Sequence, residues 1–112
     1  MDYTRFTNVE AKVLKGGNRS LNAQIVEMTA DATLTDAQKN TLAVLFTCSA
    51  ASKALTLGLD DGQIMFVANT GGTNAVTVKA ISGDTGTSVG AGKVAIVVAS
   101  KTANASKIYV LN

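Results

Sequence analysis

DDGQIMFVANTGGTNAVTVKAISGDTGTSVGAGKVAIVVA, residues 60–99, is the stretch that decides the predicted fold. Three apolar runs rich in Val and Ile, at residues 63–67, 75–81 and 93–99, alternate here with gaps that hold most of the Gly, Asn and Asp of the region. Short apolar runs separated by turn-forming residues are typical of successive β-strands. The stretch therefore predicts three strands in chain order.

The character of each run differs. Residues 63–69 are almost continuously apolar, which predicts a central strand buried on both faces. The segment NTGGTN, residues 69–74, contains two adjacent glycines that suit the positive φ angles of a tight hairpin. The next run alternates, with Val76, Val78 and Ala80 on one face, so we expect its other face to meet water or a neighbour.

Two further segments are assigned around these runs. Residues 82–92, SGDTGTSVGAG, predict a loop whose glycines allow a bulge or a sharp corner between sheets. Residues 41–48 contain several mediocre helix formers, which argues against a long helix over residues 42–51. One helical turn is expected just before them, with Thr35 as its cap and Gln38 at the third position of a capping box.

The remaining strands follow from the same pattern. We expect them at residues 23–29, at 54–59, where Leu55, Leu57 and Leu59 share one face, and at 107–111. Six or seven short strands, at spacings of about ten residues, predict an all-β fold. We expect a small antiparallel β-sandwich or jelly-roll-like domain over residues 23–112, preceded by an extended N-terminal arm, residues 1–22. A parallel α/β fold is excluded because crossover helices are lacking.

Length and composition point to assembly. A chain of 112 residues forms one small domain, which buries only about two thirds of its unfolded surface. Although 46% of the residues are hydrophobic, there are only three Phe, two Tyr and no Trp, so large buried side chains are few. Oligomerisation is one common remedy for a thin core. We therefore expect a homo-oligomer.

The N-terminal arm holds the candidate partner-binding residues, which are Tyr3, Arg5, Phe6 and Lys12. The arm is basic while the middle of the chain is acidic, so these charges either contact an acidic neighbour or are simply solvated. The two aromatic rings either dock on another surface or fold back on their own domain. Nucleic acid is not an expected partner, because dense Lys/Arg patches and aromatic stacking platforms are missing.

Residues that carry catalytic chemistry are scarce. The absence of histidine removes Ser-His-Asp and Cys-His catalysis and the commonest metal ligand. Cys48 is the only cysteine, so no intrachain disulfide can form, and it is expected to be a small buried residue. The sequence predicts a protein that is not an enzyme and has no cofactor or metal site.

Three short segments partly match known functional motifs, but each lacks the spacing or the neighbouring residues that the motif requires. Gly92 and Lys93 are followed by a β-like run instead of the Ser or Thr and the helix of a phosphate-binding loop. The DTG of residues 84–86 lacks the apolar flanks of the aspartic protease signature. Asp60, Asp61 and Asp84 lack the spacing of a calcium loop, and Asp60 and Asp61 are expected to be solvated in a turn.

No membrane partner is expected either. The polar, mixed start MDYTRFTNVE does not resemble a secretory signal. The longest apolar run, residues 94–99, is too short to cross a bilayer. We expect synthesis in a reducing cytoplasm, which agrees with the single cysteine.

From residue 33 onward, over about seventy per cent of its length, the chain follows one pattern. The pattern is a short Thr-Leu-Thr start, a Leu-rich strand, a Gly-led apolar strand ending in Asn, a Val/Thr strand, a Gly-Asp loop, and two closing strands. The segments that carry it are TLT at 33–35, LTLGL at 55–59, GQIMFVAN at 62–69, VTVK at 76–79, SGDTG at 82–86, AGK at 91–93 and YVL at 109–111. This pattern resembles the β-domains of tailed-phage head fibre and capsid decoration proteins.

The resemblance implies a non-enzymatic virion protein. It would be a capsid decoration (cement) protein or the base of a head fibre, located on the outer capsid surface and stabilising the major capsid lattice. Such proteins are trimeric or otherwise clustered and often attach through the N-terminal segment, so the major capsid protein is the expected partner and a trimer is favoured. The alternative is a phage tail or fibre-tip module that binds host carbohydrate or the cell surface.

Overall fold

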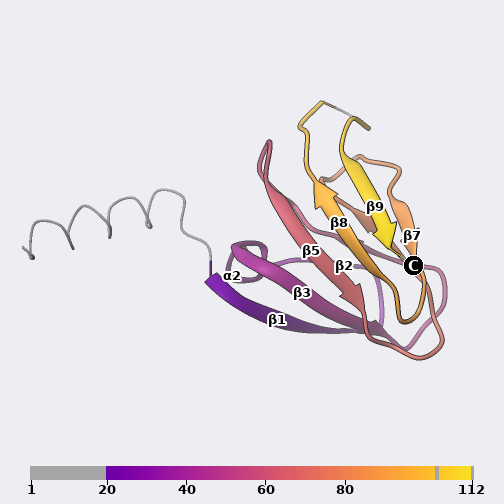
Figure 1. Ribbon diagram of the computed structural model, residues 1–112. Helices are drawn as coiled ribbons and strands as arrows, with labels where there is room; N and C mark the ends of the chain where they lie inside the picture. The colour runs from indigo at the N-terminus through magenta and orange to yellow at the C-terminus, as the bar shows by residue number, and fades with distance from the viewer. Residues whose placement is uncertain (1–19, 103, 112) are drawn as a thin grey trace, which may run out of the picture.

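The computed structural model describes residues 20–102 and 104–111, which form nine strands and one short helix (Figure 1). The elements are β1 Ser20–Met28, β2 Ala32–Thr33, α2 Asp36–Lys39, β3 Thr41–Cys48, β4 Lys53–Thr56, β5 Ile64–Asn69, β6 Val76–Lys79, β7 Thr87–Val89, β8 Val94–Val98 and β9 Lys107–Leu111. Sheet A is five-stranded, in the order β1-β3-β5-β8-β9, and sheet B is four-stranded, in the order β2-β4-β6-β7.

The first six strands alternate between the two sheets. As a result, β1, β3 and β5 pair in parallel in sheet A, and β2, β4 and β6 pair in parallel in sheet B. The paired positions in sheet B lie 23 residues apart, as in Ala32 with Leu55 and Lys53 with Val76. Parallel neighbours need a long connection, which is usually a helix. Here each connection runs through a strand of the opposite sheet, so no crossover helix is required.

The last part of the chain pairs in antiparallel fashion. β7 pairs with β6, β8 pairs with β5, and β9 pairs with β8. The chain passes from β7 in sheet B to β8 in sheet A through residues 90–93, where Gly92 has a φ of +77°. This confirms the corner between sheets that the glycines of this segment predicted.

One buried cluster is shared by the two sheets. Because every second side chain on a strand points to the same face, each long strand sends one set of side chains into this cluster. The central members from sheet A are Val44, Phe46, Met65, Val67, Ala95 and Val97. The members from the sheet B side include Leu55, Leu57, Val76, Val78 and Val89. Each Leu, Val, Met or Phe buried in this way contributes about 1.5–3 kcal/mol, so the cluster is the main source of stability.

Three expectations about the sheets are corrected by the observed pairing. The sheets are mixed and not purely antiparallel, since four of the seven strand pairings between described residues are parallel. β5 and β6 do not form a hairpin, because they belong to different sheets and residues 70–75 cross between them. β5 is the central strand of sheet A, as expected, but it is buried on one face only, because Ile64 and Phe66 are exposed.

The expected strands are found where the sequence predicted them, although most of their ends differ by one to three residues. β9 covers residues 107–111 as predicted, β3 replaces the rejected helix, and Leu55, Leu57 and Leu59 are all buried. β1 begins at Ser20 and not at residue 23, and β7 lies inside the segment expected to be a loop. β2 and β7 have two and three residues, and such short strands carry no detectable alternation.

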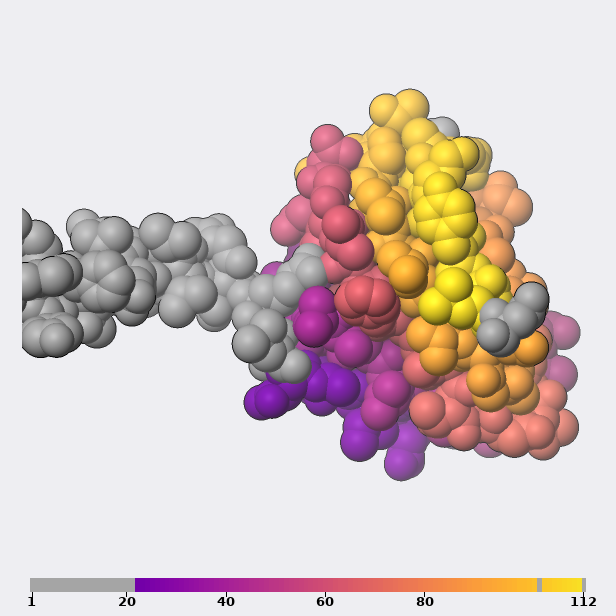
Figure 2. All heavy atoms as spheres, in the orientation of Figure 1, coloured from indigo at the N-terminus to yellow at the C-terminus, as the bar shows by residue number. Residues whose placement is uncertain are grey.

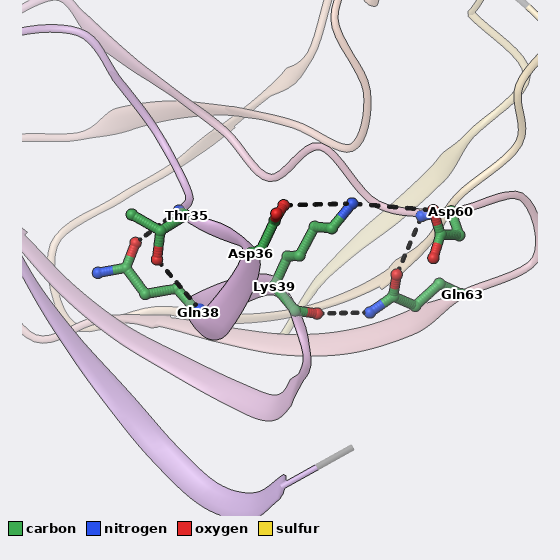
Figure 3. A network of polar contacts seen from close by, with 6 residues as sticks. All are labelled: Thr35, Asp36, Gln38, Lys39, Asp60 and Gln63. Carbon is green, nitrogen blue, oxygen red and sulfur yellow. Dashed lines mark hydrogen bonds and ion pairs between the residues drawn. The ribbon is translucent and has the colours of Figure 1, made fainter. Parts of the chain in front are cut away.

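Side-chain hydrogen bonds hold helix α2 at both of its ends (Figure 3). The hydroxyl of Thr35 accepts a hydrogen bond from the Gln38 N–H at 3.3 Å, and the Gln38 side chain accepts one from the Thr35 N–H at 2.9 Å. The predicted capping box is thereby confirmed. The Gln63 amide donates to the Lys39 carbonyl at 2.6 Å and accepts from the Asp60 N–H at 3.0 Å. The helix is thus joined to the turn before β5.

Asn69, the last residue of β5, is a buried polar link between the sheets. Its side-chain amide donates to the carbonyls of Asn74 at 2.8 Å and Val89 at 3.0 Å. Its side-chain oxygen accepts from the Gly71 N–H at 3.1 Å. Because a buried polar group is costly unless it is hydrogen-bonded, these bonds define where residues 70–75 cross from sheet A to sheet B.

Candidate functional site

The outward side of sheet A is apolar. Six large hydrophobic side chains are exposed among the described residues, and all six lie on this side: Ile25, Ile64, Phe66, Val94, Tyr109 and Leu111. Ile25 is 70% exposed and Tyr109 is 57% exposed. Figure 2 views this side of the molecule, where β1, β3, β5, β8 and β9 lie side by side. Exposed apolar residues scattered singly need no explanation, but a cluster on one face indicates an interaction surface.

The strand register places these side chains in rows that run across the sheet. One row contains Ala23, Ala43, Phe66, Ile96 and Tyr109. The next row contains Ile25, Leu45, Ala68, Val94 and Leu111. Ile64 and Val98 lie beyond the first row. We call these twelve residues the apolar face.

Charged residues occur only at the margin of this surface. The five strands of sheet A contain two charged residues, Glu27 on β1 and Lys107 on β9, and both are exposed. β1 and β9 are the two edge strands of the sheet. Glu27 pairs across from Thr47, beyond the second row, while Lys107 pairs across from Val98, beyond the first row. The two charges therefore lie at diagonally opposite corners of the apolar face.

The outward side of sheet B is polar by contrast. Its strands present Thr33, Thr56, Thr77, Lys79 and Ser88. An open hollow of about 630 Å³ lies on this side, and its lining includes hydroxyl, amide and charged side chains but no aromatic ring. Asp31 is one of the lining residues, and its carboxylate accepts a hydrogen bond from the Ala54 N–H at 2.9 Å.

The Asp-Thr-Gly segment, residues 84–86, connects two loops through hydrogen bonds to backbone N–H groups. Asp84 is buried, and its two carboxylate oxygens accept hydrogen bonds from the N–H groups of Ile81 at 3.3 Å and Asn104 at 3.0 Å. The side chain of Asn104 in turn accepts from the Thr85 N–H at 2.8 Å. These bonds join the loop before β7 to the loop before β9. The carboxylate holds backbone in place, which accords with the interpretation of this segment as a structural loop.

The other chemically interesting residues also have structural contacts. Cys48 is buried, as predicted, and its thiol donates to the Ala50 carbonyl at 3.2 Å. Asp60 is exposed and lies 3.9 Å from the Lys39 ammonium, while Asp61 accepts from the Lys101 N–H at 3.0 Å. Within residues 20–102 and 104–111, no three His, Cys, Asp or Glu side chains are grouped as metal ligands would be. The same residues include no helix that is long and apolar enough to span a membrane.

The predicted partner-binding residues Tyr3, Arg5, Phe6 and Lys12 lie outside the described residues. The apolar face was not predicted from the sequence. Its signal was present in β5, where Ile64 and Phe66 make the run continuously apolar although only alternate residues, Met65, Val67 and Asn69, are buried. That run was interpreted as burial on both faces, and the structure provides burial on one.

Comparison with protein-family models, with curated proteins and with solved structures found no match to this chain.

Proposed function

We propose that the protein is a non-enzymatic structural component of a tailed-phage virion, namely a capsid decoration (cement) protein or the base of a head fibre. The observation that carries the proposal is the gathering of every exposed large hydrophobic side chain of the described residues on one side of sheet A. A surface of this kind suits assembly with other proteins. The resemblance to head fibre and decoration proteins gives that assembly its place on the virion.

The mechanism is cementing through many modest contacts. The basic arm, with Tyr3, Arg5, Phe6 and Lys12, binds the major capsid protein on the outer surface, and the β-domain links several copies. The two sheets share one core, which supports describing this domain as a β-sandwich with mixed sheets. When several weak contacts are linked, the overall avidity exceeds that of any single contact by about 10²–10⁴. The resemblance favours a trimer for the assembled unit.

Purified virions provide the test. Quantitative mass spectrometry of DNA-filled heads is expected to find this chain in a fixed ratio to the major capsid protein. Its absence from the heads contradicts the proposal. Attachment through the arm is tested by adding full-length chain to heads that lack it: the double variant Arg5→Glu, Lys12→Glu should bind less. Lys101→Glu is the matched control, because Lys101 lies in an exposed loop of the β-domain, and it should bind as the wild type does.

The second candidate function is a tail or fibre-tip module that binds host carbohydrate. The observation that favours it is the polar hollow on sheet B, where Asn74, Thr77, Lys79 and Ser88 present hydrogen-bonding groups. It predicts that the isolated protein binds glycans or host cells and that Lys79→Ala or Ser88→Ala weakens this binding. Decoration of heads without any glycan binding would favour the first function.

A further inference from the structure

The apolar face is large enough to form an interface between chains. Adjacent strands lie about 4.8 Å apart and alternate residues about 6.8 Å apart, so the twelve residues cover roughly 390 Å². Two such faces in contact bury about 780 Å², and a polar rim around them brings the interface to the value of about 1,000 Å² that specific interfaces exceed. A second copy of the chain supplies a surface of the same size and the same apolar character.

The charges at the corners indicate which surface covers this face. Glu27 and Lys107 have opposite signs, and neither forms an ion pair with another described residue. A partner that covers the apolar face would need a positive group at one corner and a negative group at the diagonally opposite corner. The chain itself presents that pattern, and a copy turned about a two-fold axis places each charge against the opposite one.

The same corners also determine the angle between the copies. Glu27 and Lys107 are separated by four strand spacings across the sheet and by three rows along it, about 19 Å and about 20 Å. The line that joins them therefore runs at about 45° to the central strand β5. A two-fold axis in the plane of the interface, perpendicular to that line, exchanges the two corners and makes the central strands of the two sheets cross at about 90°. Near-perpendicular crossing is one of the two preferred ways in which sheets pack face to face.

We infer that the apolar face binds a second copy of this chain about a two-fold axis, with crossed strands, and that Glu27 of each copy lies against Lys107 of the other. The inference rests on the proposed function because it identifies the partner of that same surface. It predicts a dimer as the unit, in place of the trimer that the resemblance favours. Phe66 and Val94 in the central strands meet their counterparts near the axis.

Charge reversal in the full-length chain tests this arrangement. Glu27→Lys places two positive charges at each corner contact, and Lys107→Glu places two negative charges there. Sedimentation equilibrium at low salt should show that each single variant dimerises at least tenfold more weakly than the wild type. The double variant Glu27→Lys, Lys107→Glu should recover to within about threefold, because opposite charges meet again. The differences should shrink in about 1 M salt, where the Debye length is about 3 Å.

Controls separate a lost interface from lost folding. Phe66→Asp in the centre of the face should give a monomer, and Thr77→Asp on sheet B should dimerise as the wild type does. Urea unfolding of each variant checks that the fold is retained. A wild-type monomer at high micromolar concentration, a trimer, or single reversals without effect would overturn the inference. A dimer that forms as described but does not attach to heads contradicts the proposed function and leaves the inference standing.

Discussion

Gly86 precedes β7 at a point where a side chain has no room. Its φ is +84°, and an added Cβ would lie 2.8 Å from the Thr77 methyl group and from the Val78 carbonyl oxygen. Gly86→Ala is therefore expected to lower the free energy of unfolding by about 2–4 kcal/mol, through backbone strain and steric overlap. Urea denaturation measures this change.

Gly83→Ala is the matched control in the same loop. Gly83 has a φ of +95°, but nothing lies within 4 Å of its added Cβ. It should cost only about 1 kcal/mol, which is the conformational part alone. If the two variants lowered the free energy of unfolding equally, the steric overlap at Gly86 would not contribute to the loss.

Asn69 carries a second prediction at the scale of one residue. Asn69→Leu keeps the side-chain volume but leaves the Asn74 and Val89 carbonyls and the Gly71 N–H without their partner. Buried groups left unpaired cost about 1–3 kcal/mol each, so we expect a total loss of about 3 kcal/mol from the free energy of unfolding. Thr70 is an exposed residue whose hydroxyl donates one hydrogen bond, to the Phe46 carbonyl at 3.3 Å, so Thr70→Val should cost less than 1 kcal/mol. A smaller loss for Asn69→Leu than for Thr70→Val would refute the assigned role.

At the scale of elements, helix α2 depends on its cap. The helix has four residues and none of them is buried, so packing contributes little to it. Thr35→Ala removes the hydroxyl that accepts from the Gln38 N–H and is expected to lower the free energy of unfolding by about 1 kcal/mol.

Asp36→Ala, a variant of an exposed residue in the same helix, is the control for Thr35→Ala. Asp36→Ala removes a carboxylate that is exposed and 3.9 Å from the Lys39 ammonium. Exposed ion pairs contribute little, so we expect a change below about 0.5 kcal/mol by the same urea denaturation. If the two variants were equally stable, the capping box would not stabilise the helix.

The elements also show what the sequence could determine and what it could not. Local patterns sufficed for β9, for the capping box at Thr35 and Gln38, and for the buried leucines in β4 and just after it, because each depends on residues close together in the chain. Pairing depends on residues that are distant in the chain. The glycines of residues 69–74 suit a hairpin and a crossing between sheets equally well, so alternation alone could not reveal the parallel pairs.

The candidate site was harder to predict than the strands for a related reason. β5 and β8 carry apolar residues on both of their faces. Composition alone cannot distinguish a strand that is buried on both faces from a strand whose outer face binds a partner. The arm residues Tyr3, Arg5, Phe6 and Lys12 stay a prediction, since they lie outside the described residues. Only the three-dimensional register placed twelve apolar residues on one side of sheet A.

At the scale of the whole molecule, self-association should stabilise the fold. Binding that favours the folded state raises the midpoint of thermal unfolding with concentration. We expect the wild-type midpoint to rise by about 3–5 °C for each tenfold increase in chain concentration. The midpoint of Phe66→Asp should not depend on concentration. Scanning calorimetry over a hundredfold range measures both, and a wild-type midpoint that does not move would contradict self-association.

In the proposed dimer, the apolar face of each copy is covered by the other. Hydroxyl-radical labelling of the wild-type chain, read by mass spectrometry, tests this contact most directly, because Phe66 and Tyr109 are 39% and 57% exposed in a single copy. Acylation of the Lys53 and Lys79 amines on sheet B provides the reference. At chain concentrations above the dissociation constant of the dimer, labelling of Phe66 and Tyr109 should fall several-fold, while the two lysines should be acylated to the same extent as before. Equal labelling of Phe66 and Tyr109 above and below that concentration would contradict the account.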